Sequence, residues 1–97
     1  MTPNKQARAL ILAWKPIPPD LAPQVTNLDL RGTRVSDLTP LAALTSLQRL
    51  DLGGTRVSDV TPLAALASLQ SLYLAGTRVS DLTPLAALVD RGLNIYR

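Results

Sequence analysis

The sequence predicts an α/β solenoid, a right-handed coil of about four turns with a parallel concave sheet, short helical turns on the convex side and an N-terminal capping helix. Two features support this. A 22-residue motif recurs along the chain, and seventeen of its positions are identical between residues 33–54 and 55–76. Within each copy, leucines alternate with polar or small residues over a short stretch. A period of this length is typical of repeat proteins in which every coil contributes one strand.

The predicted strands contain paired leucines with a spacing of two, which indicates one buried face. The pairs are Leu28 and Leu30, Leu50 and Leu52, and Leu72 and Leu74. A glycine follows each strand and allows the chain to bend, at Gly32, Gly54 and Gly76. A threonine comes next, at Thr33, Thr55 and Thr77, and we expect its hydroxyl to satisfy backbone groups of the turn.

The helical turns are predicted from a Thr-Pro pair followed by Leu-Ala-Ala-Leu in each copy. The threonines Thr39, Thr61 and Thr83 are expected to be N-caps, and the prolines to occupy the first turn. Leucines of these turns should face the strand leucines; they are Leu41, Leu44, Leu63, Leu66, Leu85 and Leu88. Leu47 and Leu69 should close the coil.

The motif Leu47-x-x-Leu50-x-Leu52-x-x-Thr55-x-Val57-x-Asp59-Val60-x-Pro62-Leu63 resembles the 22-residue, internalin-type bacterial leucine-rich repeat, over residues 25–96. The resemblance implies a module that binds proteins through exposed positions of the concave sheet. Members of that family usually have Asn where this chain has Thr33, Thr55 and Thr77, and the Asn side chains form a hydrogen-bonded ladder between coils. The resemblance therefore implies a threonine ladder here.

Residues 1–24 are predicted to form a capping helix and a Pro-rich connector, and residues 25–97 the solenoid, in a single domain overall. In the helix, Ala7, Leu10, Ile11 and Trp14 share one apolar face that should plug the first coil. An amphipathic membrane anchor is the alternative, with Lys5, Arg8 and Lys15 as its basic residues. The Lys15–Pro19 segment is a stiff connector or a Pro-rich ligand.

At the C-terminus, Asp90-Arg91-Gly92 predicts a turn, and Leu93-Asn94-Ile95 a last short strand with one residue fewer than the repeat requires. No separate cap is evident from the sequence. Because open solenoid ends tend to associate, a homodimer through this end is an expected alternative.

Outward positions of the strands predict three columns across the sheet. The first holds Asn27, Arg49 and Ser71, the second Asp29, Asp51, Tyr73 and Asn94, and the third Arg31, Gly53, Ala75 and Tyr96. Three of the five differences between the matched repeats lie in these columns, as expected for a constant scaffold with a differentiated binding face. That face has a projected area of about 250 Å², less than the ~800 Å² per partner of a standard interface, so weak or peptide binding is expected.

A second regular feature is an arginine in each coil, at Arg34, Arg56 and Arg78, followed three residues later by Asp37, Asp59 and Asp81. One interpretation is a solvated edge on which the two rows compensate each other. The other is an anion-binding stripe. The net charge of +3 is modest for a nucleic-acid binder, so nucleic acid is not an expected partner.

The chain lacks Cys and His, which argues against disulfides, against common metal or cofactor sites, and against an enzyme. Asp29 and Asp51 should form a surface salt-bridge cluster with Arg31 and Arg49, and a metal or acid–base role for the two aspartates is the weakest alternative. No signal peptide or membrane span is predicted, and we expect a cytoplasmic location. The sequence thus predicts a non-catalytic module for a protein or peptide, with a structural scaffold, designed or recently duplicated, as the alternative.

Overall fold

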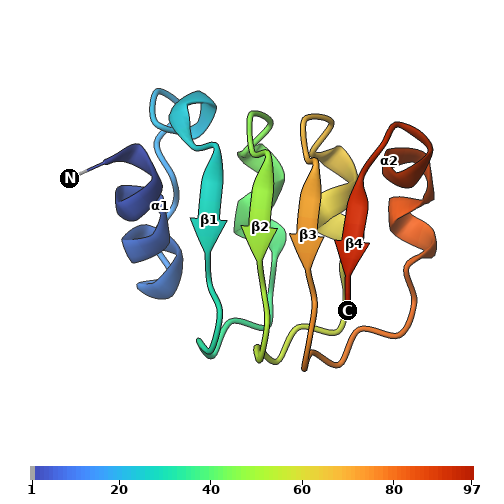
Figure 1. Cartoon of the computed structure of the whole chain (residues 1–97). Coiled ribbons are helices and arrows are strands. Elements are labelled where there is room, and N and C mark those ends of the chain that lie inside the picture. The colour runs from blue at the N-terminus through green and yellow to red at the C-terminus, as the bar shows by residue number, and fades with distance from the viewer. Residues whose placement is uncertain (1) are drawn as a thin grey trace.

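The computed structural model describes residues 2–97, which form a four-stranded parallel sheet in the order β1-β2-β3-β4 (Figure 1). The strands are β1 (Asn27–Asp29), β2 (Arg49–Asp51), β3 (Ser71–Tyr73) and β4 (Asn94–Tyr96). α1 (Pro3–Leu12) lies beside β1, and α2 (Ala86–Asp90) belongs to the last coil. The convex turns are 3₁₀ helices over Ala22–Gln24, Thr39–Ala43, Thr61–Ala65 and Thr83–Leu85. The predicted solenoid architecture is confirmed.

The core lies between the sheet and the convex turns, where the two sets of predicted leucines meet. Leu50 and Leu52 of the second coil are fully buried, as are Leu63 and Leu66 of the turn that follows. The remaining predicted strand and turn leucines are at most 5% exposed. Each coil therefore buries its apolar side chains against its neighbours, which is why a strand of only three residues persists in this fold.

The turns after the strands depend on glycine and threonine. Gly54 has a φ of +70°, a left-handed conformation that costs other residues free energy. The hydroxyl of Thr55 donates to Leu52 C=O at 2.7 Å, and Thr33 and Thr77 make the equivalent bond. These bonds confirm that the threonines satisfy turn carbonyls. They lie within one coil, however, so the threonine ladder between coils is wrong.

Backbone groups link the coils instead. Gly54 N–H donates to Ala75 C=O at 2.8 Å, and Arg56 N–H donates to Val35 C=O at 3.2 Å. The same two bonds recur one coil away, from Gly32 to Gly53 C=O and from Arg78 to Val57 C=O. Because a hydroxyl is shorter than an asparagine side chain, it reaches the carbonyl three residues back in its own coil but not the next coil.

The convex turns begin differently from the prediction. Thr39 is already the first residue of its 3₁₀ helix, so the threonines are not N-caps. Asp37 supplies the acceptor: its carboxylate accepts from Thr39 N–H at 2.9 Å and from the Thr39 hydroxyl at 2.6 Å. An aspartate side chain readily bonds the backbone two residues ahead, and this local turn sets the start of the helix.

The N-terminal helix covers the open edge of the sheet. Thr2 caps it by accepting from Lys5 N–H at 3.2 Å, and Ala7 and Ile11 are buried against the first coil. Asn4 Oδ1 accepts from Thr26 N–H at 3.0 Å, and Arg8 Nε donates to Asp29 C=O at 2.9 Å. These polar contacts occupy backbone groups that would otherwise stay unpaired at an edge strand.

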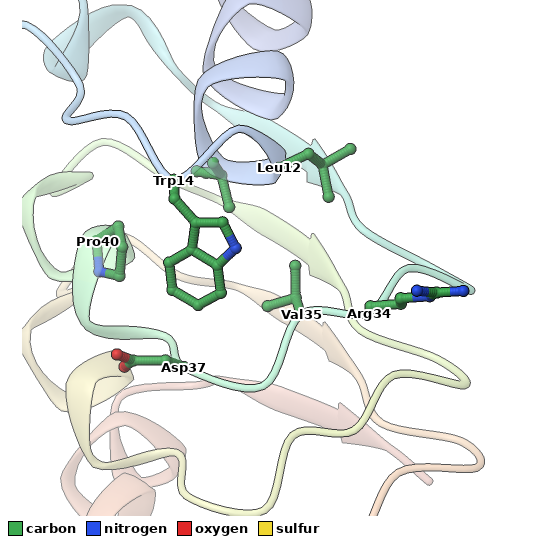
Figure 2. A pocket seen from close by; sticks show the side chains of 7 residues that line it. Leu12, Trp14, Arg34, Val35, Asp37 and Pro40 are labelled. Carbon is green, nitrogen blue, oxygen red and sulfur yellow. The ribbon is translucent and has the colours of Figure 1, made fainter.

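Trp14 is not on the buried face of this helix, and that part of the prediction is wrong. The helix ends at Leu12, and Trp14 has a φ of +58°. Its N–H bonds Ile11 C=O while Lys15 N–H bonds Leu10 C=O, the pattern of a Schellman motif with Trp14 at the left-handed position. The indole is 66% exposed and lies beside Val35 and Pro40 (Figure 2).

The last coil is one residue longer than the repeat, whereas the sequence predicted one residue fewer. Ile95 pairs with Leu72, and β4 spans Asn94–Tyr96 rather than residues 93–95. The physical reason is α2. An α-helix advances about 1.5 Å per residue and a 3₁₀ helix about 2.0 Å, so an α-helical turn needs more residues to span the same distance. Gly92, with a φ of +109°, ends α2 and returns the chain to the sheet. Of the helices within residues 2–97, none is long and apolar enough to cross a membrane.

Candidate binding face

One column of side chains crosses all four strands at the same register. Asp29 pairs with Asp51, Asp51 with Tyr73, and Tyr73 with Tyr96. The sequence predicted Asn94 at the end of this column and Tyr96 in the next one. Both positions are wrong because the last coil has one more residue: Tyr96 ends this column, and Asn94 pairs with Ser71 in the neighbouring one. The concave face therefore has two carboxylates on β1 and β2 and two aromatic rings on β3 and β4.

The aromatic half is an ordered stack. The Tyr73 and Tyr96 ring centroids are 4.8 Å apart with an interplanar angle of 13°, and the Arg49 guanidinium carbon lies 4.9 Å from the Tyr73 centroid. Tyr96 is 48% exposed. Stacking orders these three long side chains in the unbound protein. Arginine and tyrosine are also common anchors of protein interfaces.

The acidic half has little internal compensation. Asp29 Oδ2 lies 3.7 Å from the Arg31 guanidinium, in a pair whose side chains are 62% and 68% exposed and therefore weakly coupled. Asp51 Oδ1 accepts from Gly53 N–H at 2.9 Å. Over residues 2–97 the Asp29–Arg31 pair is the one salt bridge, so the predicted cluster of Asp29, Asp51, Arg31 and Arg49 is wrong for both Asp51 and Arg49.

The other predicted residues of the face surround this column. Asn27, Arg49, Ser71 and Asn94 form the neighbouring column on the N-terminal side, with Ser71 opposite Asn94. Arg31 and Ala75 lie beyond the strand ends and are exposed, whereas Gly53 is buried. A shallow hollow on β1 and β2 is lined by Asn27, Leu28, Asp29, Arg31, Arg49 and Asp51.

The arginine row lies on the loops after the strands, at Arg34, Arg56 and Arg78, all exposed. The backbone N–H groups of Arg56 and Arg78 donate to carbonyls of the preceding loops, which fixes the position of each arginine relative to the preceding coil. A further arginine, Arg97, extends the row. Its Nη2 donates to Val79 C=O at 3.3 Å, and the equivalent carbonyl of the previous coil, Val57 C=O, accepts from Arg78 N–H. The sequence analysis missed this contact because Arg97 lies outside the repeat.

The aspartate row binds threonines rather than arginines. The pKa of Asp37 and that of Asp59 lie below the ordinary value. The main cause is the hydrogen bond from the hydroxyl of the threonine two residues later, and the second cause is the bond from that threonine's N–H. At Asp59 the charges of Asp37 and Asp81 act in the opposite direction, because the same aspartate recurs in the coil before and in the coil after. The three threonines were predicted as helix caps, and their spacing to the aspartates was the available signal for these bonds.

Groupings of three or more His, Cys, Asp or Glu side chains able to hold a metal ion do not occur among residues 2–97. The column of Asp29 and Asp51 has only two such groups, with Arg31 beside them. The face offers hydrogen bonding, charge and aromatic contact to a partner.

Parallel three-residue strands, glycine turns and a leucine core with this period define a leucine-rich-repeat solenoid. The chain belongs to this family: the family described as "Leucine Rich repeats (2 copies)" matches residues 23–65 and residues 45–87. Proteins with this repeat generally mediate protein–protein interactions. No curated protein sequence matches the chain.

Solved structures include similar solenoids. An internalin (inlF) from Listeria monocytogenes is 29% identical with a TM-score of 0.70, over 86% of this chain and 24% of that one. An internalin C2 (inlC2) from the same species is 28% identical with a TM-score of 0.58, over 86% of this chain and 46% of that one. The chain thus spans less than half the length of either internalin.

A structure of Mex67:Mtr2 subunits from Chaetomium is 20% identical with a TM-score of 0.53, over 96% of this chain and 68% of that one. This likeness concerns the fold alone. The bacterial, internalin type expected from the motif stays a prediction.

Proposed function

We propose that the protein is a non-catalytic module that binds a protein or peptide through the concave face. The observation that carries the proposal is the stack of Arg49, Tyr73 and Tyr96 on an otherwise repetitive scaffold. The next coil copies the core of the previous one but replaces Arg49 with Ser71 and Asp51 with Tyr73. The face is small, so binding should be weak or directed at a short segment. The cytoplasmic location stays a prediction.

A selection from a random peptide library tests this proposal. Peptides should be enriched by the wild-type protein and lose binding to the Arg49→Ala/Tyr73→Ala variant. The matched control is Arg91→Ala/Val89→Ala, which removes one exposed arginine and one exposed apolar side chain away from the sheet and from the arginine row. Equal binding by all three proteins would contradict the concave face as the site.

Self-association through β4 is a second candidate. Asn94 N–H donates to Gln70 C=O and Tyr96 C=O accepts from Leu74 N–H, both toward β3. Since successive residues of a strand alternate direction, the N–H and C=O of Ile95 point away from the sheet. At the opposite edge, Asn4 and Arg8 occupy the backbone of β1. Two copies of β4 would be self-complementary at Ile95, giving a closed dimer.

Light scattering coupled to size exclusion, over a concentration series, tests this dimer. A dimer mediated by backbone hydrogen bonds should form at high concentration and persist in high salt. A monomer at millimolar concentration would refute it.

The arginine row is a third candidate, as a binder of anionic segments. Its support is that the carboxylates of Asp37 and Asp59 bond threonines rather than arginines. Binding of a poly-glutamate probe should fall steeply with salt and weaken in Arg56→Ala/Arg78→Ala. Salt-independent binding would rule out this candidate.

A further inference from the structure

We infer that the concave face takes a peptide in the polyproline II conformation, with a cationic side chain and, three residues away, an aromatic one. The inference rests on the proposed binding function and assigns the chemistry of the partner. The column Asp29, Asp51, Tyr73 and Tyr96 carries it, since this column divides into an acidic and an aromatic half.

The acidic half lacks a cation for its second carboxylate. Arg49 is the residue placed to neutralise Asp51, yet its guanidinium lies on the Tyr73 ring at 4.9 Å. No salt bridge to Asp51 occurs among residues 2–97. Asp29 and Asp51 are register partners on neighbouring strands, so both carboxylates can face one incoming guanidinium or ammonium group. A cationic side chain would also relieve the repulsion between them.

The aromatic half is already ordered for a planar side chain. Tyr73 and Tyr96 stack at 4.8 Å, and Tyr96 remains 48% exposed. Because Tyr96 stacks on one face of Tyr73 and the Arg49 guanidinium lies over the same Tyr73 ring, the accessible aromatic surface is concentrated at the ring and ring edges of Tyr96. Aromatic side chains pack well against such edges in offset or edge-to-face arrangements.

The spacing selects the conformation of the partner. Asp51 on β2, the carboxylate without a cation, and the exposed Tyr96 on β4 are two strand spacings apart, about 9.6 Å. In polyproline II, residues three apart point the same way and are separated by about 9.3 Å. In an extended β-strand, residues that point the same way are about 6.7 or 13.4 Å apart, and neither distance matches. A polyproline II segment crossing the strands therefore reaches both halves at once.

Four synthetic peptides test the inference: Arg-Pro-Pro-Tyr, its reverse Tyr-Pro-Pro-Arg, the shortened Arg-Pro-Tyr and the acidic Asp-Pro-Pro-Tyr. All carry blocked ends. Nuclear magnetic resonance titration of the labelled protein reports affinity and the residues that respond. We expect one or both of the three-residue spacings to bind with a Kd of about 0.1–1 mM, as fits a small face, and to shift signals of Asp51, Tyr73 and Tyr96.

Variants separate specific from general attraction. Asp29→Asn/Asp51→Asn should weaken the best peptide about fivefold. Asp37→Asn/Asp59→Asn changes the charge equally on the convex side and should have no effect. Tyr96→Leu should also weaken binding, and high salt should weaken it in the wild type. Equal affinity for the shortened or acidic peptide would overturn the inference.

The peptide selection described above distinguishes the failure of this inference from the failure of the proposed function. If selected peptides require Arg49 and Tyr73 but lack a cation three residues from an aromatic residue, the face binds peptides and the assigned chemistry is wrong. If no peptide depends on the face, both are wrong.

Discussion

Removing the two side chains that cover the edge of β1 should destabilise the whole solenoid. Asn4 accepts from Thr26 N–H, and Arg8 donates to Asp29 C=O at 2.9 Å. Each bond contributes about 1 kcal/mol, which for Arg8 is below the ~1.5–3 kcal/mol typical of charged groups because its bond is exposed to solvent. Because alanine improves helix propensity by about 0.5 kcal/mol in total, we expect Asn4→Ala/Arg8→Ala to lose about 1.5 kcal/mol.

Urea unfolding followed by circular dichroism measures this loss. A small domain has a total stability of about 5–15 kcal/mol, so the midpoint should fall clearly at an unchanged slope, and the Tm should fall by about 10 °C. Lys5→Ala/Gln6→Ala is the matched control, since both residues are exposed on the same helix. Asn4→Asp should retain most of the stability because it keeps the acceptor. A double variant within about 0.5 kcal/mol of the control would refute the capping role.

Three further changes test the scaffold. Leu50→Ala should cost about 2–5 kcal/mol in urea unfolding because Leu50 is fully buried, and a loss below 1 kcal/mol would contradict the packing. Gly54→Ala should cost about 1 kcal/mol because of its positive φ, with no backbone atom closer than 3.8 Å to obstruct it; a neutral result would contradict the turn. The Thr61 hydroxyl, followed by its N–H, lowers the pKa of Asp59 in the folded state, so this carboxylate stabilises the fold above its unfolded pKa. That contribution is lost as pH falls through the lowered value, and Thr61→Val should raise the Asp59 pKa in a carbon-detected titration; an unchanged pKa would exclude the hydroxyl as the main cause.

The repeated part of the fold could be predicted from the sequence because the same pattern of residues occurs in one coil after another. The burial of Leu50 and Leu63 and the turn at Gly54 all follow from that repetition. Within the repeat, the errors concern which partner each threonine side chain bonds, as at Thr39 and Thr55. The errors in chain path lie where the repetition stops. Trp14 continues the helical spacing, but a Schellman motif ends the helix before it.

The candidate site was predicted in composition but not in arrangement. The sequence placed Tyr73 and Arg49 on the concave face, whereas the pairing of Tyr96 with Tyr73 depends on how many residues the last coil uses. That number is set by the choice between an α-helix and a 3₁₀ helix. The two conformations compete closely over a stretch as short as Ala86–Asp90, and local pattern alone does not separate them.

The near identity of the central coils has a consequence for folding. A chain that paired its strands one coil out of step would bury almost the same leucines, so the core by itself discriminates poorly between in-step and shifted pairings. Discrimination comes from the parts that occur once: Asn4 and Arg8 at one edge, and α2 with its extra residue at the other. Removing residues 55–76 as a unit would join Gly54 to Thr77, the same Gly-Thr junction that each coil already has. The solenoid can therefore gain or lose whole coils without a new kind of junction, while the non-repeated residues at its two ends set the register of the strands.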